Sequence, residues 1–420
     1  MIYCYVNMTK RSTQWGMLGL LFSAAVINYL DRQALSVAAP VIRQQYQISP
    51  TEYAQILSAF MLAYALMHPI AGKVIDMLGT YRGFSLAVSW WSLACAGHAF
   101  ATGIVSFSFF RFLLGMGESG LLPASIKAVS EWFSKQERAF AVGIINIGIG
   151  VGGILAPPLI AGLILLFDWR IAFLISGALG FLWLGAWMLF HQGRRKSHQE
   201  SEAPYVEAPT QVSWRGLLSY REVWGLMAAR LIADSAWYFY LFWLPEYLSQ
   251  ERGFSIRQIG TSAWVPYLTA CLGSFTGGFF SDHLIKRGWS VTSARKIVMV
   301  TSALLMPTTI FAAYVQEPAP AIALMSLATF LIQVWATNLF TLPSDLFSSH
   351  VVASVYGFSG FTGSLSAMIF MPVVGAVVET YSYTPIFIGV GLLHLVATGV
   401  VLILIPGFKL MSHEKRYVIM

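Results

Sequence analysis

Two charged side chains stand next to each other in a long apolar segment near the start of the chain. Asp31 and Arg32 are the only ionised residues between Trp15 and Ile42, a run long enough to cross a bilayer as a helix. A charge at that depth costs about 2.5–3.5 kcal/mol on insertion scales, so charges retained there suggest a function. Neighbouring residues on a helix point about 100° apart, so each of the two needs its own partner. We interpret them as the core of a transport site, with a structural ion pair as the alternative.

A second apolar segment contributes Arg111 and Glu118, seven residues apart on one helical face. Two turns separate them by roughly 10 Å, which is too far for a direct bond within the helix. We therefore expect Arg111 to compensate a carboxylate and Glu118 to face a cavity, although both could serve packing alone. A guanidinium presents parallel donors to a carboxylate and keeps its charge, so Arg32 and Arg111 are candidate anion binders.

The second half of the chain also carries polar residues in apolar segments. Arg230 and Asp234 are four residues apart and are expected to bridge each other as a gate or structural pair. His68, one turn after Tyr64, could titrate near neutral pH, and its role stays open. Further candidates for stacking on a ring or bonding hydroxyl groups, with helix packing as the alternative, are Tyr238, Asn146, Asn338, Ser359 and Ser364.

The composition is that of a polytopic membrane protein. Hydrophobic residues make up 57% of the 420 residues and charged residues 11%, against about 25% charged in soluble domains. The net charge of +7 resides mainly in short loops, which indicates membrane topology and argues against a nucleic-acid partner. Three cysteines without CxxC spacing predict neither a zinc site nor a disulfide framework. The first apolar run is too long for a cleaved signal, so we expect no removable targeting peptide.

Twelve apolar stretches predict twelve membrane-spanning helices. Most Lys and Arg residues fall on one side of these stretches, which predicts that both termini are cytoplasmic. The long polar segment 191–221 is interpreted as a cytoplasmic linker between an N-terminal bundle, 1–190, and a C-terminal bundle, 222–420. The predicted helices are 17–40, 52–75, 83–104, 107–128, 139–166, 170–190, 223–248, 259–280, 296–315, 319–343, 353–378 and 383–406.

The two halves of the chain repeat. Gly72 and Asp76, followed by Arg82, recur as Gly278 and Asp282 in the second half. A parallel duplication of six helices is typical of transporters of the major facilitator type. Catalytic motifs are missing from the sequence: it contains no Walker A, HExxH or suitable nucleophile elbow, which argues against an ATP-driven pump and an enzyme. A match to the dinucleotide fingerprint, GMGESG at 115–120, follows no strand and is better explained by close helix packing.

Several motifs resemble a known family. GKVIDMLGTYRG resembles the signature between helices 2 and 3 of the major facilitator superfamily, and DWRIAF resembles its entry into helix 6. INYLDR, RFLLGMGESGLLPASIKAVSEWF, ERAFAVGIINIG and ARLIADSAWYFYLFWLPEYL resemble the anion:cation symporters, most of all the hexuronate and galactonate type of sugar-acid proton symporter. The resemblance implies an all-α membrane protein with twelve transmembrane helices in two pseudo-symmetric six-helix bundles.

The resemblance also implies roles for individual residues. Asp31 and Glu118 would carry protons, whereas Arg32, Tyr29 and Tyr64 would meet the substrate carboxylate. The signature residues Asp76, Arg82 and Asp282 are expected to act as gate or structural residues.

The expected function is import of a sugar-acid monoanion driven by a proton gradient, with no other cofactor. The expected partners are a small organic anion, protons and the lipid bilayer of the inner or plasma membrane, and we expect a monomer. A symporter or exchanger for an aromatic or other carboxylate is the alternative. A membrane sensor that binds without transport is disfavoured by the short loops and duplicated halves.

Overall fold

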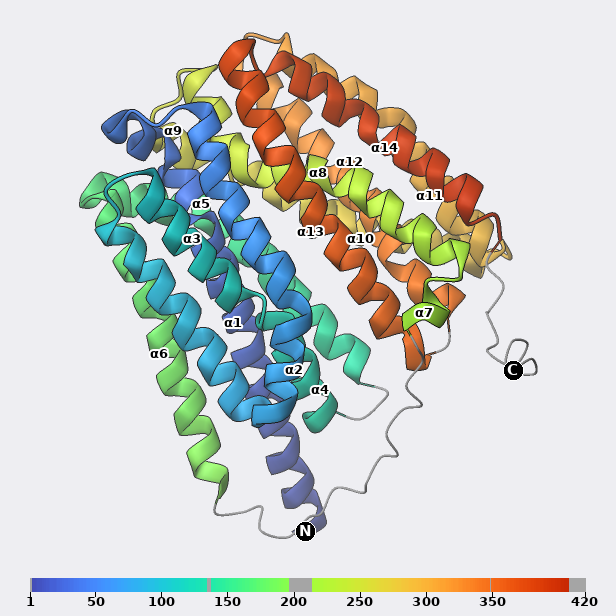
Figure 1. Ribbon diagram of the computed structural model, residues 1–420. Helices are drawn as coiled ribbons and strands as arrows, with labels where there is room; N and C mark the ends of the chain where they lie inside the picture. Colours follow the sequence, from blue (N-terminus) through green and yellow to red (C-terminus); the bar gives the residue numbers. More distant parts are fainter. Residues whose placement is uncertain (1, 134–136, 196–213, 348, 408–420) are drawn as a thin grey trace. The chain divides into compact units, whose positions relative to one another are not determined.

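The computed structural model describes residues 2–133, 137–195, 214–347 and 349–407, and every regular element in these ranges is helical (Figure 1). The first half contains α1 (Ile2–Tyr46), α2 (Pro50–Gly97), η1 (His98–Phe100), α3 (Ile104–Glu118), α4 (Leu121–Trp132), α5 (Arg138–Leu166) and α6 (Trp169–Arg195). The second half contains α7 (Trp214–Leu217), α8 (Arg221–Gln250), α9 (Ile256–Ser262), α10 (Val265–Lys286), α11 (Val291–Leu305), η2 (Met306–Ala313), α12 (Pro318–Leu346), α13 (Ser349–Thr380) and α14 (Thr384–Leu404).

The helices coincide with the predicted spans, and the predicted fold class is confirmed. Seven helical stretches are long and apolar enough to cross a membrane on length and composition alone, or eight if the two bent parts of α2 are counted together as one span. The long helices α1, α8 and α10 are not among these stretches, and they carry polar as well as apolar side chains. Two starting boundaries differ most from the prediction. Helix α1 begins at Ile2, well before the predicted 17. The span predicted to begin at 259 begins at Val265, where Pro266 occupies the first turn, a position that tolerates proline.

Helix α2 covers two predicted spans and bends where a glycine breaks the helical backbone. A straight helix of 48 residues would be roughly 72 Å long, more than twice the hydrocarbon thickness of a bilayer. Gly79 adopts φ 75° and ψ 161°, a conformation that glycine reaches without steric cost. The helix therefore consists of two arms, which correspond to the predicted helices 52–75 and 83–104.

The helices form two compact units. Unit 1 comprises Met1–Glu202 with Leu241–Trp264, and unit 2 comprises Ala203–Tyr240 with Val265–Met420. The last turns of α8 thus pack with unit 1 and its first turns with unit 2. Residues 196–213 of the predicted linker lie outside the described residues, and the predicted domain boundaries stay a prediction.

Within unit 1, α3 packs against both arms of α2, and α1 packs against α5 (Figure 1). Two glycines allow α3 to approach closely. A Cβ atom at Gly115 would collide with the carbonyl oxygen of Phe60 on the first arm, and one at Gly117 would lie 2.7 Å from the backbone nitrogen of Trp91 on the second. The packing interpretation of the fingerprint-like glycines is confirmed.

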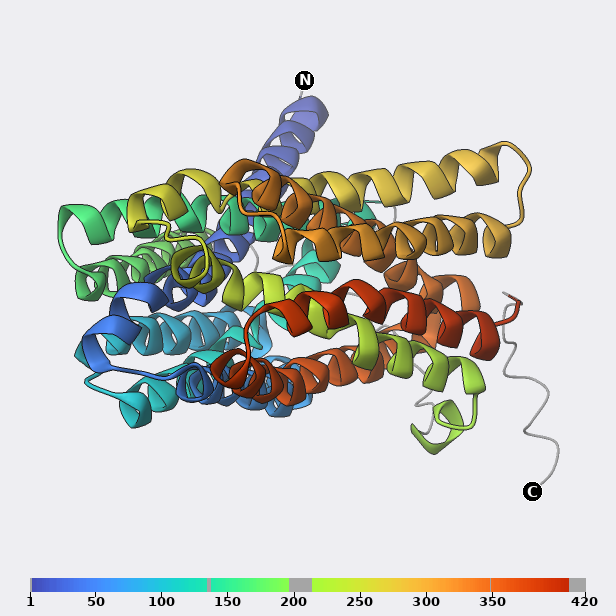
Figure 2. The same cartoon turned by 90° about the horizontal axis from the view of Figure 1, so that it is seen from above.

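Unit 2 repeats part of this arrangement. Helix α10 packs against α12 as α2 packs against α3, and α11 packs against α14 as α2 packs against α6. The first half of α8 lies beside α14, where Gly225 faces Ile405 (Figure 2). A buried cluster that includes Leu226, Trp335 and Val401 joins these helices. The internal duplication seen in the sequence is therefore present in the helix pairing.

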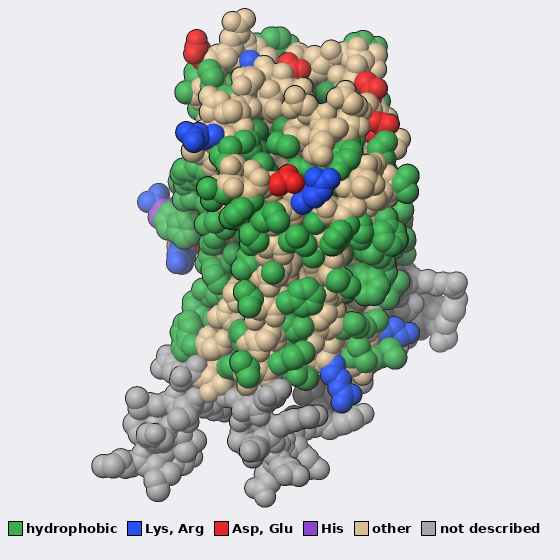
Figure 3. All heavy atoms as spheres, turned by 90° about the vertical axis from the view of Figure 1, so that its left-hand side faces the viewer, with side chains coloured by type: hydrophobic (Ala, Val, Ile, Leu, Met, Phe, Trp, Pro, Cys, Tyr) green, Lys and Arg blue, Asp and Glu red, His purple; other side chains and the backbone are tan. Residues whose placement is uncertain are grey.

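Many large apolar side chains point away from the protein. On the face drawn in Figure 3, apolar side chains form a broad band and charged ones are sparse. Val105, Leu166 and Leu182 are 84%, 75% and 71% exposed. Exposed apolar surface on this scale suits a lipid environment. The chain is a multi-pass membrane protein.

Candidate functional site

Unit 1 contains a buried ion pair between α1 and α3. The Nε atom of Arg32 donates to Oε2 of Glu118 at 2.7 Å, and the two side chains are 3% and 0% exposed. The contact joins residues 86 positions apart in the sequence. Two of the predicted site residues are thus brought together by the fold.

Aromatic rings surround the Arg32 guanidinium. Its Cζ atom lies 4.7 Å from the ring centroid of Tyr29, 4.6 Å from that of Tyr64 and 5.3 Å from that of Phe60. Contacts of this kind hold a cation in place without neutralising its charge. His68 contacts Tyr64 with ring centroids 4.6 Å apart. The predicted cluster of Arg32 with two tyrosines is present, while the substrate role of its members stays a prediction.

Arg111 has a different partner from the one expected. Both terminal nitrogens donate to the backbone carbonyl of Arg32 at 3.1 Å, and the side chain is fully buried. Arg111 thus bonds a backbone carbonyl where a carboxylate was expected, and the expected roles of Arg111 and Glu118 in the site stay predictions. Glu118 pairs with Arg32, and Arg111 fixes the backbone of α1 at that position. Spacing along one helix could not reveal either contact, because both cross to another helix.

Asp31 is fully buried next to this pair. Neither of its carboxylate oxygens has a hydrogen-bond partner among the described residues, and the thiol of Cys95 lies beside it. Asn28 and Gln33, also fully buried on α1, likewise lack partners for their amide groups in this part of the structure. Unsatisfied polar groups in a core are costly, so their concentration here indicates a functional role.

The other candidates for binding hydroxyl groups are dispersed. Asn146 is exposed on α5, and Tyr238 is half-buried on α8. Asn338 is buried, and its amide nitrogen donates to the carbonyl oxygens of Gly277 and Val334. The hydroxyl groups of Ser359 and Ser364 donate to backbone carbonyls of their own helix, α13. Their predicted substrate contacts stay predictions.

The predicted pair on α8 forms as the spacing suggested. Arg230 Nη2 lies 2.8 Å from Asp234 Oδ2, and both side chains are 12% exposed. The guanidinium also lies over the rings of Phe340 and Tyr356, at 4.8 and 5.8 Å. Because all these residues belong to unit 2, the pair and its surroundings form one local arrangement.

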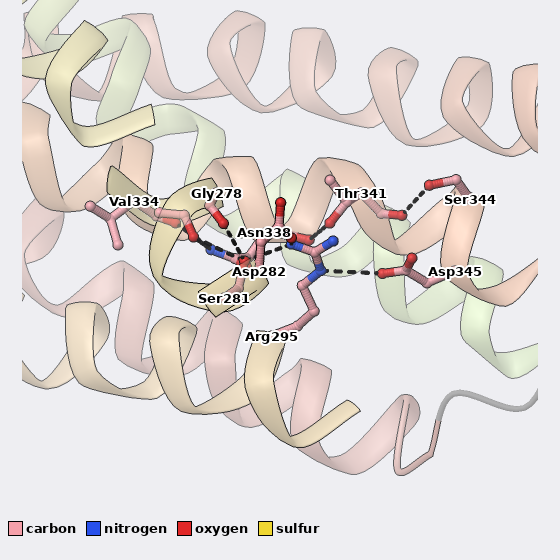
Figure 4. Close-up of polar contacts among 10 residues, drawn as sticks. Gly278, Ser281, Asp282, Arg295, Val334, Asn338, Thr341, Ser344 and Asp345 are labelled. Atoms are coloured by element: carbon pink, nitrogen blue, oxygen red, sulfur yellow. Dashed lines mark hydrogen bonds and ion pairs between the residues drawn. The ribbon is translucent and has the colours of Figure 1, made fainter. Parts of the chain in front are cut away.

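The signature residues take part in two different networks. In unit 1, Lys127 Nζ lies 2.8 Å from Asp76 Oδ1, and Arg82 is exposed. In unit 2, Arg295 lies between Asp282 and Asp345, at 3.3 and 3.4 Å (Figure 4). Arg295 also donates to the hydroxyl oxygen of Ser281 at 2.6 Å. The two repeats of the signature therefore differ in how their aspartate is held.

Sequence reasoning missed a further buried contact in unit 1. Arg43 forms an ion pair with Glu246, whose side chain is 0% exposed. Nearby, the Tyr53 hydroxyl donates to the Phe242 carbonyl at 3.0 Å. Glu246 stands in the apolar run FWLPEYL, and the argument applied to Asp31 would have marked it. Its partner is not apparent from sequence, because 203 positions separate the two residues.

The described residues contain no group of three or more His, Cys, Asp or Glu side chains that could hold a metal ion. The chemistry available to the site comes instead from guanidinium, carboxyl, hydroxyl and aromatic groups. Such groups can bind an organic anion and exchange protons.

Known proteins of similar sequence and structure place these features in a family. Residues 21–371 match the Major Facilitator Superfamily. The chain is 34% identical over 391 residues to the hexuronate transporter of Escherichia coli strain K12, with 90% of each chain covered. It is 37% identical over 311 residues to the galacturonate transporter of Dickeya chrysanthemi, covering 70% of this chain and 90% of the relative.

A crystal structure of a bacterial homologue of the human lysosomal transporter Spinster, inward-facing and unoccupied, has the same fold. The TM-score is 0.72 over 93% of this chain and 95% of the other, at 19% identity. The resemblance drawn from the sequence motifs is confirmed by the two relatives. This chain belongs to the Major Facilitator Superfamily.

Proposed function

We propose that the protein imports a sugar-acid monoanion, a hexuronate or an aldonate, together with protons and by alternating access. The observation that carries the proposal is the buried Arg32–Glu118 pair, flanked by Tyr29 and Tyr64. A guanidinium suits a carboxylate, and tyrosines offer hydroxyl groups and ring faces to a sugar. The similarity to hexuronate and galacturonate transporters supports this substrate class.

The ion pair suggests how proton and substrate binding are linked. A proton on Glu118 would remove the charge that holds Arg32 and leave the guanidinium to the substrate carboxylate. Loss of that proton to the cytoplasm would restore the pair and expel the substrate. In this scheme the partner of Arg32 is Glu118 on α3, not the adjacent Asp31. Asp31 is the candidate for a second proton, because its carboxyl group is buried and forms no ion pair in the described structure.

Two proton carriers would change how the membrane potential acts. An inside-negative potential opposes entry of one anion by about 2.3 kcal/mol per 100 mV. One proton cancels the charge of a monoanion, whereas two protons make the potential assist uptake. Asp31 and Glu118 together provide the two sites that this scheme needs.

The proposal extends to the setting of the protein. It is a carrier and not an enzyme, it works as a monomer in the inner or plasma membrane, and both of its termini are cytoplasmic. The basic residues concentrated in the loops on one side support this orientation. The proton gradient is its only energy source.

The proposal is tested with purified protein in liposomes. Labelled galacturonate, galactonate and an aromatic acid are offered with and without an inward proton gradient. We expect accumulation of a sugar acid that requires the gradient and that is abolished in Glu118→Gln, which should retain exchange without net accumulation.

The matched control is Glu52→Gln, which removes a carboxylate from a helix cap in the same unit. This variant should accumulate substrate like the wild type. Transport of the aromatic acid alone would refute the substrate class, and accumulation independent of the gradient would refute proton coupling. For Arg32→Lys we expect a higher apparent KM, since an ammonium cannot offer parallel donors.

A further inference from the structure

The Arg230–Asp234 pair lies on a single helix and is electrically balanced. Both Nε and Nη2 of Arg230 donate to the same oxygen, Oδ2 of Asp234, at 2.9 and 2.8 Å. Residues four apart on a helix face the same side, so the pair needs no other helix to form. Its net charge is zero as long as both side chains are ionised.

One edge of the guanidinium is buried and makes no hydrogen bond within the described residues. The Nη1 atom of Arg230 has no hydrogen-bond partner within the described ranges, although the side chain is mostly buried. The rings of Phe340 and Tyr356 lie against the guanidinium, and Tyr356 is 41% exposed. A buried donor without a partner, with aromatic rings against it, can bond a polar group of a ring or chain that reaches it during transport.

Two glycines of α13 make room for the pair. A Cβ atom at Gly363 would collide with the Asp234 carboxylate, and it would lie 2.8 Å from Nη2 of Arg230. At Gly360, a Cβ atom would lie 3.5 Å from Nη1. A hydrogen bond of 2.8 Å between Ser235 and Ser366 fastens α8 to α13 next to this point. Helix α13 therefore packs directly against the pair.

The charge balance determines which groups can bind at this edge. A hydroxyl or carbonyl oxygen can accept from Nη1 without an ionic partner. A carboxylate would meet a guanidinium already neutralised by Asp234, and it would be repelled by that carboxylate. Juxtaposed like charges disfavour binding at desolvated sites, so the edge discriminates by charge.

We propose that the Arg230–Asp234 pair is a charge filter that admits the neutral end of a monoanionic sugar acid and rejects aldarates, which carry a carboxylate at each end. The inference rests on the proposed function and specifies its substrate class. It requires only that the substrate contacts this pair at some stage of transport. Asp234 is thereby a specificity-determining residue, and Arg230 a hydrogen-bond donor to substrate.

The test compares galacturonate with galactarate in liposomes that contain the full-length protein. The wild type should carry galacturonate and take up galactarate poorly. Asp234→Asn leaves Arg230 as a net cation, so the galactarate-to-galacturonate ratio should rise about tenfold or more, as expected for removing one like-charge contact. The double variant Arg230→Gln/Asp234→Asn is again neutral and should lose this gain.

The control is Asp345→Asn, which removes a carboxylate from the Arg295 network of the same unit and should leave the ratio unchanged. A wild type that carries both substrates equally overturns the inference without any variant. So does an unchanged ratio in Asp234→Asn, or in Asp234→Ser if the asparagine variant cannot be purified. A wild type that carries neither sugar acid would instead count against the proposed function.

Discussion

The two units hold their buried charges in opposite ways. In unit 1, Arg32 on α1 pairs with Glu118 on α3, and the fully buried carboxyl group of Asp31 forms no ion pair among the described residues. In unit 2, Arg230 and Asp234 pair within one helix. The Arg32–Glu118 pair depends on the packing of α1 against α3. The Arg230–Asp234 pair lies within α8 and does not depend on the position of another helix.

This difference assigns different tasks to the two units. A pair shared by two helices can be broken by a small displacement or a single proton, so it can report on ligand and proton binding. A pair within one helix keeps its geometry during movement and is better suited to a constant selection of substrate. Under the proposed function, unit 1 would switch with proton binding and unit 2 would select the substrate.

The largest expected effect comes from breaking the pair of unit 1. Glu118→Gln removes the charge that compensates Arg32, and loss of one partner of a buried ion pair costs about 3–5 kcal/mol. Asp31→Asn breaks no ion pair and should change stability by about 1 kcal/mol or less. Thermal unfolding in detergent measures both. Equal destabilisation would show that the Asp31 carboxyl has a compensating partner.

The sequence predicted the helices well because apolar length and basic loops are properties of single segments. Arg230 and Asp234 were paired correctly for the same reason, since their spacing alone decides the contact. Contacts between helices could not be derived in this way. The partner of Glu118 and the backbone contact of Arg111 depend on helix rotation and packing, which no single segment encodes.

A smaller effect should follow from crowding the pair of unit 2. Gly363→Ala places a methyl group against Asp234 and Arg230, and overpacking of this kind costs about 1–3 kcal/mol. Gly360→Ala makes only an ordinary contact and is the matched control. Unfolding midpoints of the two purified variants provide the comparison. Equal midpoints for Gly363→Ala and Gly360→Ala would mean that α13 moves aside and does not pack tightly against the Arg230–Asp234 pair.

The smallest effect is expected at the signature of unit 1. Lys127 and Asp76 are 25% and 75% exposed, so Lys127→Gln should cost about 0–1 kcal/mol. Arg295 is 11% exposed and contacts two carboxylates, so Arg295→Gln should cost about 1–3 kcal/mol. The unfolding midpoint of each variant is measured at low and high salt. Salt should reduce the effect of Lys127→Gln more than that of Arg295→Gln, because screening weakens exposed ion pairs more than buried ones. A larger loss for Lys127→Gln would reverse the proposed contrast between the repeats.

The glycine contacts of α3 have a mechanical consequence. Gly115 touches the arm of α2 before Gly79, and Gly117 touches the arm after it. Because α3 contacts both arms of α2, a change of angle at Gly79 would shift or tilt α3. Arg111 and Glu118 both belong to α3. A change of angle at Gly79 would therefore also shift Arg111 and Glu118.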